Sequence, residues 1–188
     1  MRPIARALLL LVVALSATGC GYNTIQTRDE AVNSALAQVK VQLQRRADLV
    51  PNLVETVKGF AAQESQVFTA VSDARSRLAG AVQTGSVAEM AEANAALTAP
   101  LGRLLAIVEA YPELKSNQNF LDLQDQLEGT ENRIAVARQD YNSAVESFNG
   151  YIRRFPYNLT AKIFGSGTPR EYFDLTSPGA AEVPRVQF

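Results

Sequence analysis

Apolar residues recur at intervals of three and four along most of this chain, from Ile25 to Phe155. In an α-helix this spacing places the side chains on one face, whereas a half-buried strand needs alternation at every second residue. No segment shows convincing strand alternation. The periodic stretches cover residues 25–43, 53–78, 87–111 and 120–155. The pattern therefore predicts an all-α chain in which each helix buries one apolar stripe.

The breaks between these stretches predict how the helices connect. Asp48 suits a helix N-cap with Pro51 in the first turn, although one long helix kinked at Pro51 is an alternative. Gly80 and Gly85 separate the second stretch from the third, and Tyr111–Pro112 ends the third. Long helices with short connections predict an antiparallel, up-and-down four-helix bundle.

Two further features limit the helices. Pro100 lies inside the third stretch and is expected to kink or split it, because proline lacks the backbone N–H of a helical hydrogen bond. Ser116–Asn117 is expected to cap the fourth. After Pro156 the periodicity stops. Prolines in the tail, residues 157–188, argue against a long helix there, whereas its aromatic residues predict that it packs on something.

The first nineteen residues have the layout of a secretory signal. Arg2 and Arg6 precede an unbroken apolar run over residues 7–15, and small residues follow. The run is shorter than the roughly 20 residues that a membrane-spanning helix needs. The sequence Ala-Thr-Gly-Cys at 17–20 resembles a bacterial lipobox, although the family pattern prefers Leu where this chain has Ala17.

The lipobox predicts cleavage after Gly19 and acylation of Cys20, which is the only cysteine in the chain. The alternative is an ordinary signal peptide with an incidental cysteine. Several acyl chains would hold the protein firmly on a membrane. Gly21, where an Asp would favour the inner membrane, predicts the outer membrane facing the periplasm in a Gram-negative cell. The expected organisation is a signal over 1–19, a bundle over 20–156 and a tail over 157–188.

Composition argues against several classes of function. The chain has no histidine, so di-iron carboxylate sites, most zinc sites and acyl-transfer triads lack a required residue. Eighteen basic and nineteen acidic residues leave no basic stripe for nucleic acid. We therefore expect no metal, no cofactor, no nucleic-acid partner and no enzymatic activity.

Polar residues interrupt the apolar stripes at three positions, Glu64, Asn94 and Thr130. A buried carboxylate at Glu64 would need a partner, for which Arg75, Arg133 and Arg138 are candidates. A polar layer that sets helix register is the expected explanation. The alternative is a polar site inside the bundle.

The densest charge cluster is Arg45, Arg46 and Asp48. It suits an acidic partner or lipid headgroups, but such clusters are more often solvated or paired within a helix. Glu131 and Arg138, in the fourth helical stretch, are placed to face it. Acid against base across helices would fix register rather than catalyse a reaction.

Three stretches resemble the LemA family: VQLQRRADLVPNLVETVKGFAAQE (41–64), EAYPELKSNQNFLDLQDQLEGTENRIAVARQDYN (109–142) and SFNGYIRRFPYN (147–158). The resemblance implies an all-helical antiparallel bundle, exposed outside the cytoplasm and held by one N-terminal anchor. Many relatives use an uncleaved transmembrane helix there, whereas this chain offers a lipobox. The family has no established enzymatic activity, and its members tend to associate with other membrane or envelope proteins, including membrane proteases.

Together these features predict an anchored, non-enzymatic scaffold or adaptor for another membrane or envelope protein. The expected contact surfaces are the Arg45–Asp48 turn and the tail around Tyr172–Phe173. Leftover apolar stripes allow a homo-oligomer. The alternative function is a periplasmic small-molecule binder or hydrolase that uses Glu64 and Glu131 inside the bundle, since paired carboxylates can do acid–base work without histidine.

Overall fold

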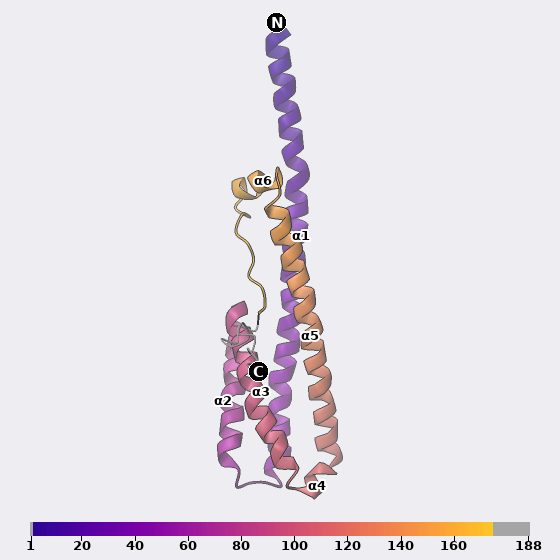
Figure 1. Ribbon diagram of the computed structural model, residues 1–188, viewed down its shortest axis with the longest axis vertical. Helices are drawn as coiled ribbons and strands as arrows, with labels where there is room; N and C mark the ends of the chain where they lie inside the picture. The colour runs from indigo at the N-terminus through magenta and orange to yellow at the C-terminus, as the bar shows by residue number, and fades with distance from the viewer. Residues whose placement is uncertain (1, 175–188) are drawn as a thin grey trace, which may run out of the picture. The chain divides into compact units, whose positions relative to one another are not determined.

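The computed structural model describes residues 2–174, and describes side chains for residues 21–174. Every regular element in this part of the chain is an α-helix (Figure 1). The helices are α1 (Arg2–Lys58), α2 (Ser65–Thr84), α3 (Val87–Val108), α4 (Pro112–Lys115), α5 (Gln118–Ile152) and α6 (Tyr157–Ile163). The all-α prediction is therefore confirmed.

Helix α1 does not end near Asp48, and the predicted start of a new helix there is wrong. Pro51 lies inside α1 and cannot donate to the carbonyl of Ala47 one turn earlier. Arg75 of α2 replaces that donor, because its Nε lies 3.1 Å from the carbonyl oxygen of Ala47. The freed acceptor is thus satisfied, and the alternative of one helix continuing through Pro51 is correct.

The chain turns instead at residues 59–64, inside the stretch that was expected to form one helix. The amide of Phe60 donates to the Val57 carbonyl at 3.0 Å, and that of Glu64 to the Ala61 carbonyl at 3.1 Å. Phe60 is 37% exposed, although the periodicity places it in the apolar stripe. Glu64 is the residue before α2, and its side chain makes no capping hydrogen bond.

Local signals place the other helix ends well. Gly85 ends α2 in the left-handed conformation (φ 80°), which glycine adopts without steric cost. Ser86 then caps α3, where its Oγ accepts from the Glu89 amide at 3.3 Å. Asn117 caps α5 as expected, with its Oδ1 accepting from the Phe120 amide at 3.2 Å. Pro100 lies inside α3 without splitting it, so of the two predicted effects the split does not occur.

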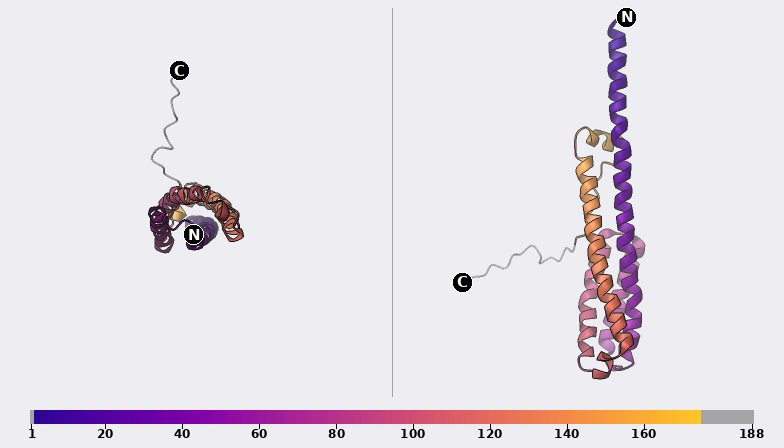
Figure 2. Two further views of the ribbon diagram at one scale, coloured as in Figure 1. Left: turned by 90° about the horizontal axis from the view of Figure 1, so that it is seen from below. Right: turned by 90° about the vertical axis from the view of Figure 1, so that its right-hand side faces the viewer.

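The chain forms two compact units, and α1 and α5 contribute to both. Of the described residues, the first unit contains 2–38 and 138–172, and the second contains 39–137 and 173–174. In the second unit α2 and α3 pack side by side (Figures 1 and 2). Its apolar interior includes Val39, Leu43, Val50, Leu53, Val57, Phe68, Val71, Leu78, Met90, Leu97, Leu101, Leu104, Phe120 and Ile134.

The first unit combines parts of α1 and α5 with α6, a turn at residues 164–165 and an extended segment over residues 166–172. Its interior is smaller and includes Ile25, Val32, Tyr141, Val145, Phe148, Ile152 and Ala161. The tail thus begins with a short helix rather than with irregular structure alone. The described part of the tail ends at residue 174, and Phe173 in it is buried.

Candidate functional site

A buried polar cluster joins three helices of the second unit. Arg46 of α1 is only 4% exposed. Its Nη1 donates to Oδ1 of Asn94 on α3 at 2.5 Å and lies 3.0 Å from Oε2 of Glu131 on α5. Asn94 is also buried, whereas the Glu131 side chain is half exposed (51%). The cluster places a charge inside the apolar interior and supplies it with a carboxylate and an amide oxygen.

Burial controls the electrostatics of this cluster. Desolvation lowers the pKa of the Arg46 guanidinium from its usual value, and the nearby Glu131 carboxylate raises it in partial compensation. The Nε atom of Arg46 is buried and has no hydrogen-bond partner. An arginine side chain stays protonated near neutral pH, so Arg46 acts in this cluster as a fixed charge that connects three helices.

The other residues of the expected turn lie on the surface. Arg45 and Asp48 are exposed, and Asp48 accepts from Nε2 of Gln44 at 2.8 Å and lies 4.0 Å from Nη2 of Arg75. They line a shallow groove of about 460 Å³ with Val41, Gln44, Leu49 and Asn52 of α1 and Gln126 of α5. The three residues predicted as one cluster therefore separate into a buried Arg46 and a surface groove beside it.

The structure does not bring the two candidate carboxylates into one apolar-walled site. Glu64 lies in the connection between α1 and α2, whereas Glu131 lies within α5 and pairs with Arg46. Thr130 is buried as expected, but its hydroxyl donates to the Gln126 carbonyl at 2.7 Å on its own helix. Arg138 lies in the first unit. Within residues 21–174 no group of three or more His, Cys, Asp or Glu side chains could hold a metal ion.

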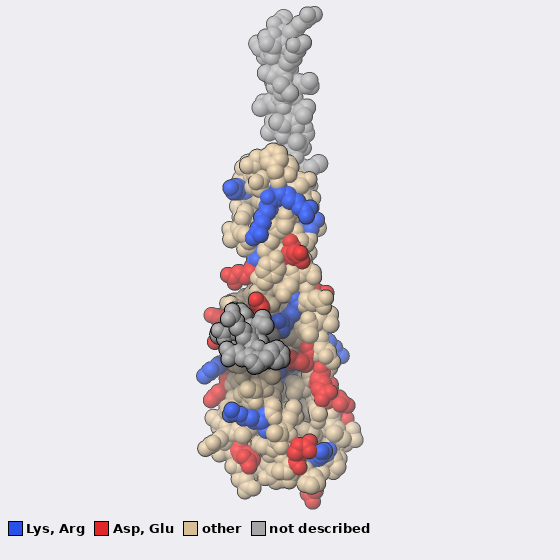
Figure 3. Space-filling model, viewed as in Figure 1, with Lys and Arg blue, Asp and Glu red and all other residues tan. Residues whose placement is uncertain are grey.

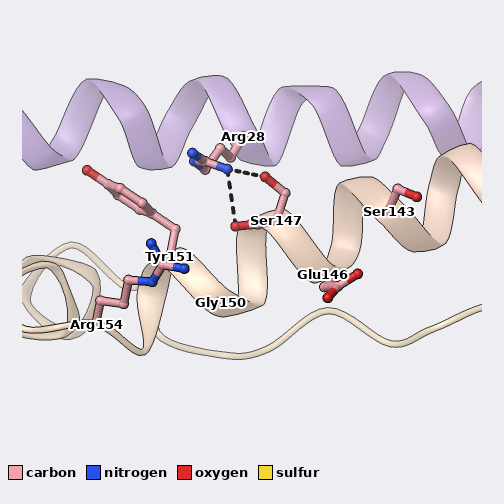
Figure 4. A pocket seen from close by; sticks show the side chains of 7 residues that line it. All are labelled: Arg28, Ser143, Glu146, Ser147, Gly150, Tyr151 and Arg154. Atoms are coloured by element: carbon pink, nitrogen blue, oxygen red, sulfur yellow. Dashed lines mark hydrogen bonds between the residues drawn. The ribbon is translucent and has the colours of Figure 1, made fainter.

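The first unit contains a second polar cleft, of about 330 Å³, between α1 and α5 (Figure 4). Arg28 of α1 lies over the Tyr151 ring at 4.8 Å and donates to the carbonyl of Ser147 at 3.3 Å and to its hydroxyl. Glu146 and Arg154 complete the polar lining. The cleft thus combines hydroxyl groups, one carboxylate and two guanidinium groups, a set of donors and charges that suits the binding of a polar ligand.

Side chains of α1 and α5 hold the extended segment in place by an arrangement that we call the segment clamp. Asn149 forms two hydrogen bonds with the backbone of Arg170, at 2.8 and 2.9 Å. The Arg170 guanidinium forms a bidentate pair with Asp29, with contacts of 2.8–3.0 Å. The Tyr141 hydroxyl donates to the Glu171 carbonyl at 2.8 Å. Backbone recognition of this kind orders the segment without a regular hydrogen-bond ladder.

Comparison with known proteins identifies the family of this chain. The model of the LemA family matches residues 35–188. The chain belongs to the LemA family. Magnetosome protein MamQ 2 of Paramagnetospirillum magneticum is 32% identical over 195 residues, which cover 91% of this chain and 71% of that protein. MamQ of Magnetospirillum gryphiswaldense is 28% identical over 185 residues (86% and 68%). Protein LemA of Metamycoplasma hominis is 22% identical over 165 residues (87% and 71%).

The surface of this LemA-family protein carries both signs of charge. Acidic and basic side chains intermix over the face drawn in Figure 3. Within the described part of the chain, no helix is both long enough and apolar enough to cross a bilayer. The expected signal cleavage at Gly19 and lipidation at Cys20 lie outside the residues whose side chains are described.

Sequence reasoning did not identify the segment clamp or the Arg28 cleft. Asn149 carried a usable signal, because it is a polar residue between two buried positions, Phe148 and Ile152, in the last turns of α5. Asp29 and Arg170 carried no signal in the sequence. They are separated by 141 residues in the chain, and each reads as an ordinary surface charge.

Proposed function

We propose that this LemA-family chain is a lipoprotein of the cell envelope, held through Cys20, that acts as a non-enzymatic helical scaffold or adaptor for another envelope protein. The observation that carries the proposal is the pairing of Arg46 with Asn94 and Glu131. The buried charge of the second unit, Arg46, is paired with side chains of two other helices, so this polar cluster supports a structural role. In a Gram-negative cell, Gly21 after Cys20 favours the outer membrane facing the periplasm.

Residues 39–137 suit a scaffold. Helical segments from α1, α2, α3 and α5 each direct an apolar stripe inward, and we propose that they form an up-and-down four-helix bundle. The buried Arg46 would fix the register of such a bundle, as buried polar groups do in coiled coils. A bundle with a fixed register presents its outer face in one geometry, which an adaptor requires.

The surface groove beside Arg46 is the proposed contact for a partner protein. Val41 is 58% exposed, and Leu49 lies on the same face of α1. Arg45 and Asp48 border these apolar residues, so the groove offers an apolar floor with charges of both signs. Interfaces commonly place apolar contacts at the centre and polar groups at the rim. Arg46 itself is buried and is not available to a partner.

Cross-linking in living cells tests the adaptor role. We expect the full chain to capture a specific envelope protein, and Arg45→Glu to reduce that capture about tenfold, as expected when an interfacial charge is reversed. Arg133→Glu is the matched control, because Arg133 is an exposed arginine of α5 outside the groove. Circular dichroism should show equal helix content in both variants. Equal capture by both would exclude the groove as the contact.

Mass spectrometry of the intact protein tests the anchor. The wild-type chain should begin at Cys20 and carry acyl groups, and Cys20→Ser should lose them together with firm membrane attachment. A wild-type chain that retains residues 1–19, or has an unmodified Cys20, would contradict the proposed anchor.

The alternative of a periplasmic binder or hydrolase has less support. It requires two carboxylates in one low-dielectric site, so that one is held protonated. Glu131 is instead half exposed and lies 3.0 Å from the Arg46 guanidinium. Glu64 lies in a connection between helices. Hydrolysis of generic ester or glycoside substrates that is lost in Glu131→Gln would favour this alternative.

A further inference from the structure

The end of the first unit that follows α5 exposes large apolar side chains. Phe155 is 79% exposed, Leu159 52%, Ile163 74% and Phe164 57%. These residues lie within one stretch of ten positions, on α6 and at its two ends. Single exposed apolar residues are normal in a monomer, but four large ones within ten positions indicate an interaction site.

Helix α6 has the reverse of the usual amphipathic arrangement. Its buried residues are the small Thr160 and Ala161, whereas the large Leu159 and Ile163, one turn apart, are exposed. The helix is therefore positioned against the first unit by small side chains and presents its large ones to the surroundings. Exposed apolar side chains cost free energy in water, so the outer face of α6 would be stabilised by contact with an apolar surface.

The chain segment around α6 is basic, and Glu146 and Glu171 lie at its two ends. From residue 147 to residue 170 there is no acidic residue, but there are four basic ones. Arg153, Arg154 and Lys162 are exposed beside the apolar group, and Arg170 is engaged in the segment clamp. Exposed apolar and aromatic residues bordered by Lys and Arg are typical of a surface that binds anionic lipid.

The same region contacts the residues that directly follow Cys20. The Tyr22 ring lies 4.7 Å from the Phe164 ring, centroid to centroid. Gly21 lies so close to Tyr157 that a Cβ there would be 2.7 Å from its Cδ1, so the close approach requires glycine. The exposed apolar group is thus held in space against Gly21 and Tyr22, the two residues that follow the proposed lipid anchor at Cys20.

We infer that Phe155, Leu159, Ile163 and Phe164, with Arg153 and Lys162, form a lipid-binding surface, here called the α6 surface. It inserts its apolar side chains into the headgroup and upper acyl region of the membrane that holds the chain, while its cations contact anionic headgroups. The inference rests on the proposed membrane anchor. It adds a second contact that fixes how the first unit lies on the bilayer, which a flexible acyl anchor cannot do alone.

A single tryptophan reports directly on this insertion, because the chain contains none. We would reconstitute the full chain carrying Ile163→Trp into vesicles of phosphatidylcholine and phosphatidylglycerol, with and without brominated acyl chains. Bromine quenches only indoles that reach the lipid, so we expect a roughly twofold loss of emission. Val136→Trp is the matched control, since Val136 is also a β-branched, exposed helical residue (58%) but lies in the second unit. Its emission should be unaffected.

A charge test accompanies the depth test. Arg153→Glu and Lys162→Glu, added together to the Ile163→Trp chain, should remove most of the quenching in anionic vesicles. Quenching that survives this double substitution would overturn the role of the cations. Equal quenching of the two tryptophan variants would overturn the α6 surface as a specific contact.

Flotation and mass spectrometry separate the two proposals. A chain that floats with the vesicles but shows no quenching of Ile163→Trp overturns the α6 surface and leaves the anchor intact. Quenching in a chain whose Cys20 is unmodified supports the surface and overturns the anchor. A chain that does not float overturns both. Unquenched emission together with cross-linking of residue 163 to a protein in cells would assign the α6 surface to a protein partner, and would overturn lipid binding.

Discussion

The helices α1 and α5 contribute to both units, yet the two units use apolar side chains in opposite ways. In the second unit most large apolar residues face inward, and even a charged residue, Arg46, is buried there. In the first unit α6 exposes its large residues, and polar side chains of the segment clamp hold the extended segment. The comparison indicates that apolar burial stabilises the second unit, whereas the first keeps part of its apolar surface for contact.

The largest expected effect is a difference in stability loss between two truncations, one of an apolar side chain in the second unit and one in the first. Leu104→Ala removes a fully buried side chain of α3 and should lower the free energy of unfolding by about 2–5 kcal/mol. Ile163→Ala removes an exposed one and should change it by less than about 0.5 kcal/mol. Urea unfolding followed by circular dichroism measures both. A large loss in Ile163→Ala would show that the α6 surface is packed in solution, and would end the comparison.

The helices themselves were predictable because their signals are local. Apolar periodicity predicted the path of α5, and Ser116–Asn117 predicted its start. Pro51 was misjudged for a reason that lies outside the local sequence. The carbonyl that proline leaves without a donor is satisfied by Arg75, a residue 28 positions away from Ala47. Local sequence rules predict the loss of one hydrogen bond at a proline, but they do not show whether a side chain of another helix replaces the missing donor.

The candidate site was predictable in its residue types and less so in its arrangement. Sequence reasoning expected acid opposite base across helices, and Arg46 with Glu131 fulfils that expectation. It grouped Arg45, Arg46 and Asp48 as one surface, although successive residues on a helix point 100° apart and only Arg46 faces the interior. It also placed Glu64 on an apolar stripe, because it did not locate the turn at residues 59–64.

An intermediate effect is expected at the buried cluster of the second unit. Glu131→Ala leaves the Arg46 charge buried with only an amide oxygen, and should cost about 1–3 kcal/mol of unfolding free energy, since half of the Glu131 side chain is in water. Adding Arg46→Gln removes the buried charge but keeps a donor for Asn94. The double variant should therefore recover part of the loss, as thermal or urea unfolding would reveal.

The matched control for that cycle is Arg133→Ala on the exposed face of α5, which should change stability by less than about 0.5 kcal/mol. If Arg46→Gln deepened the loss caused by Glu131→Ala, the guanidinium would be contributing through its packing or its bond to Asn94. The second unit would then depend on that polar contact as the first depends on the segment clamp.

The smallest effect is expected at the segment clamp of the first unit. Tyr141→Phe removes the hydrogen bond to the Glu171 carbonyl and should cost about 1 kcal/mol at neutral pH. Burial raises the pKa of Tyr141, with Arg170 opposing the rise and Glu171 adding to it. Above about pH 10 the unfolded chain therefore loses this proton before the folded chain does, so wild-type stability falls as pH rises. Tyr141→Phe has no such hydroxyl, so its stability lacks this dependence on pH. The difference in unfolding free energy between the two proteins should therefore shrink as pH rises.

Tyr172→Phe provides the control for this pH profile, because Tyr172 is 48% exposed and adjacent in the same segment. Its stability should follow that of the wild type at every pH. The profile distinguishes two origins of any loss in Tyr141→Phe. A gap that closes above pH 10 belongs to the buried hydroxyl, whereas a gap that stays constant belongs to altered packing. In the second case apolar contact, and not polar geometry, would hold the extended segment, and the two units would differ less than their interiors indicate.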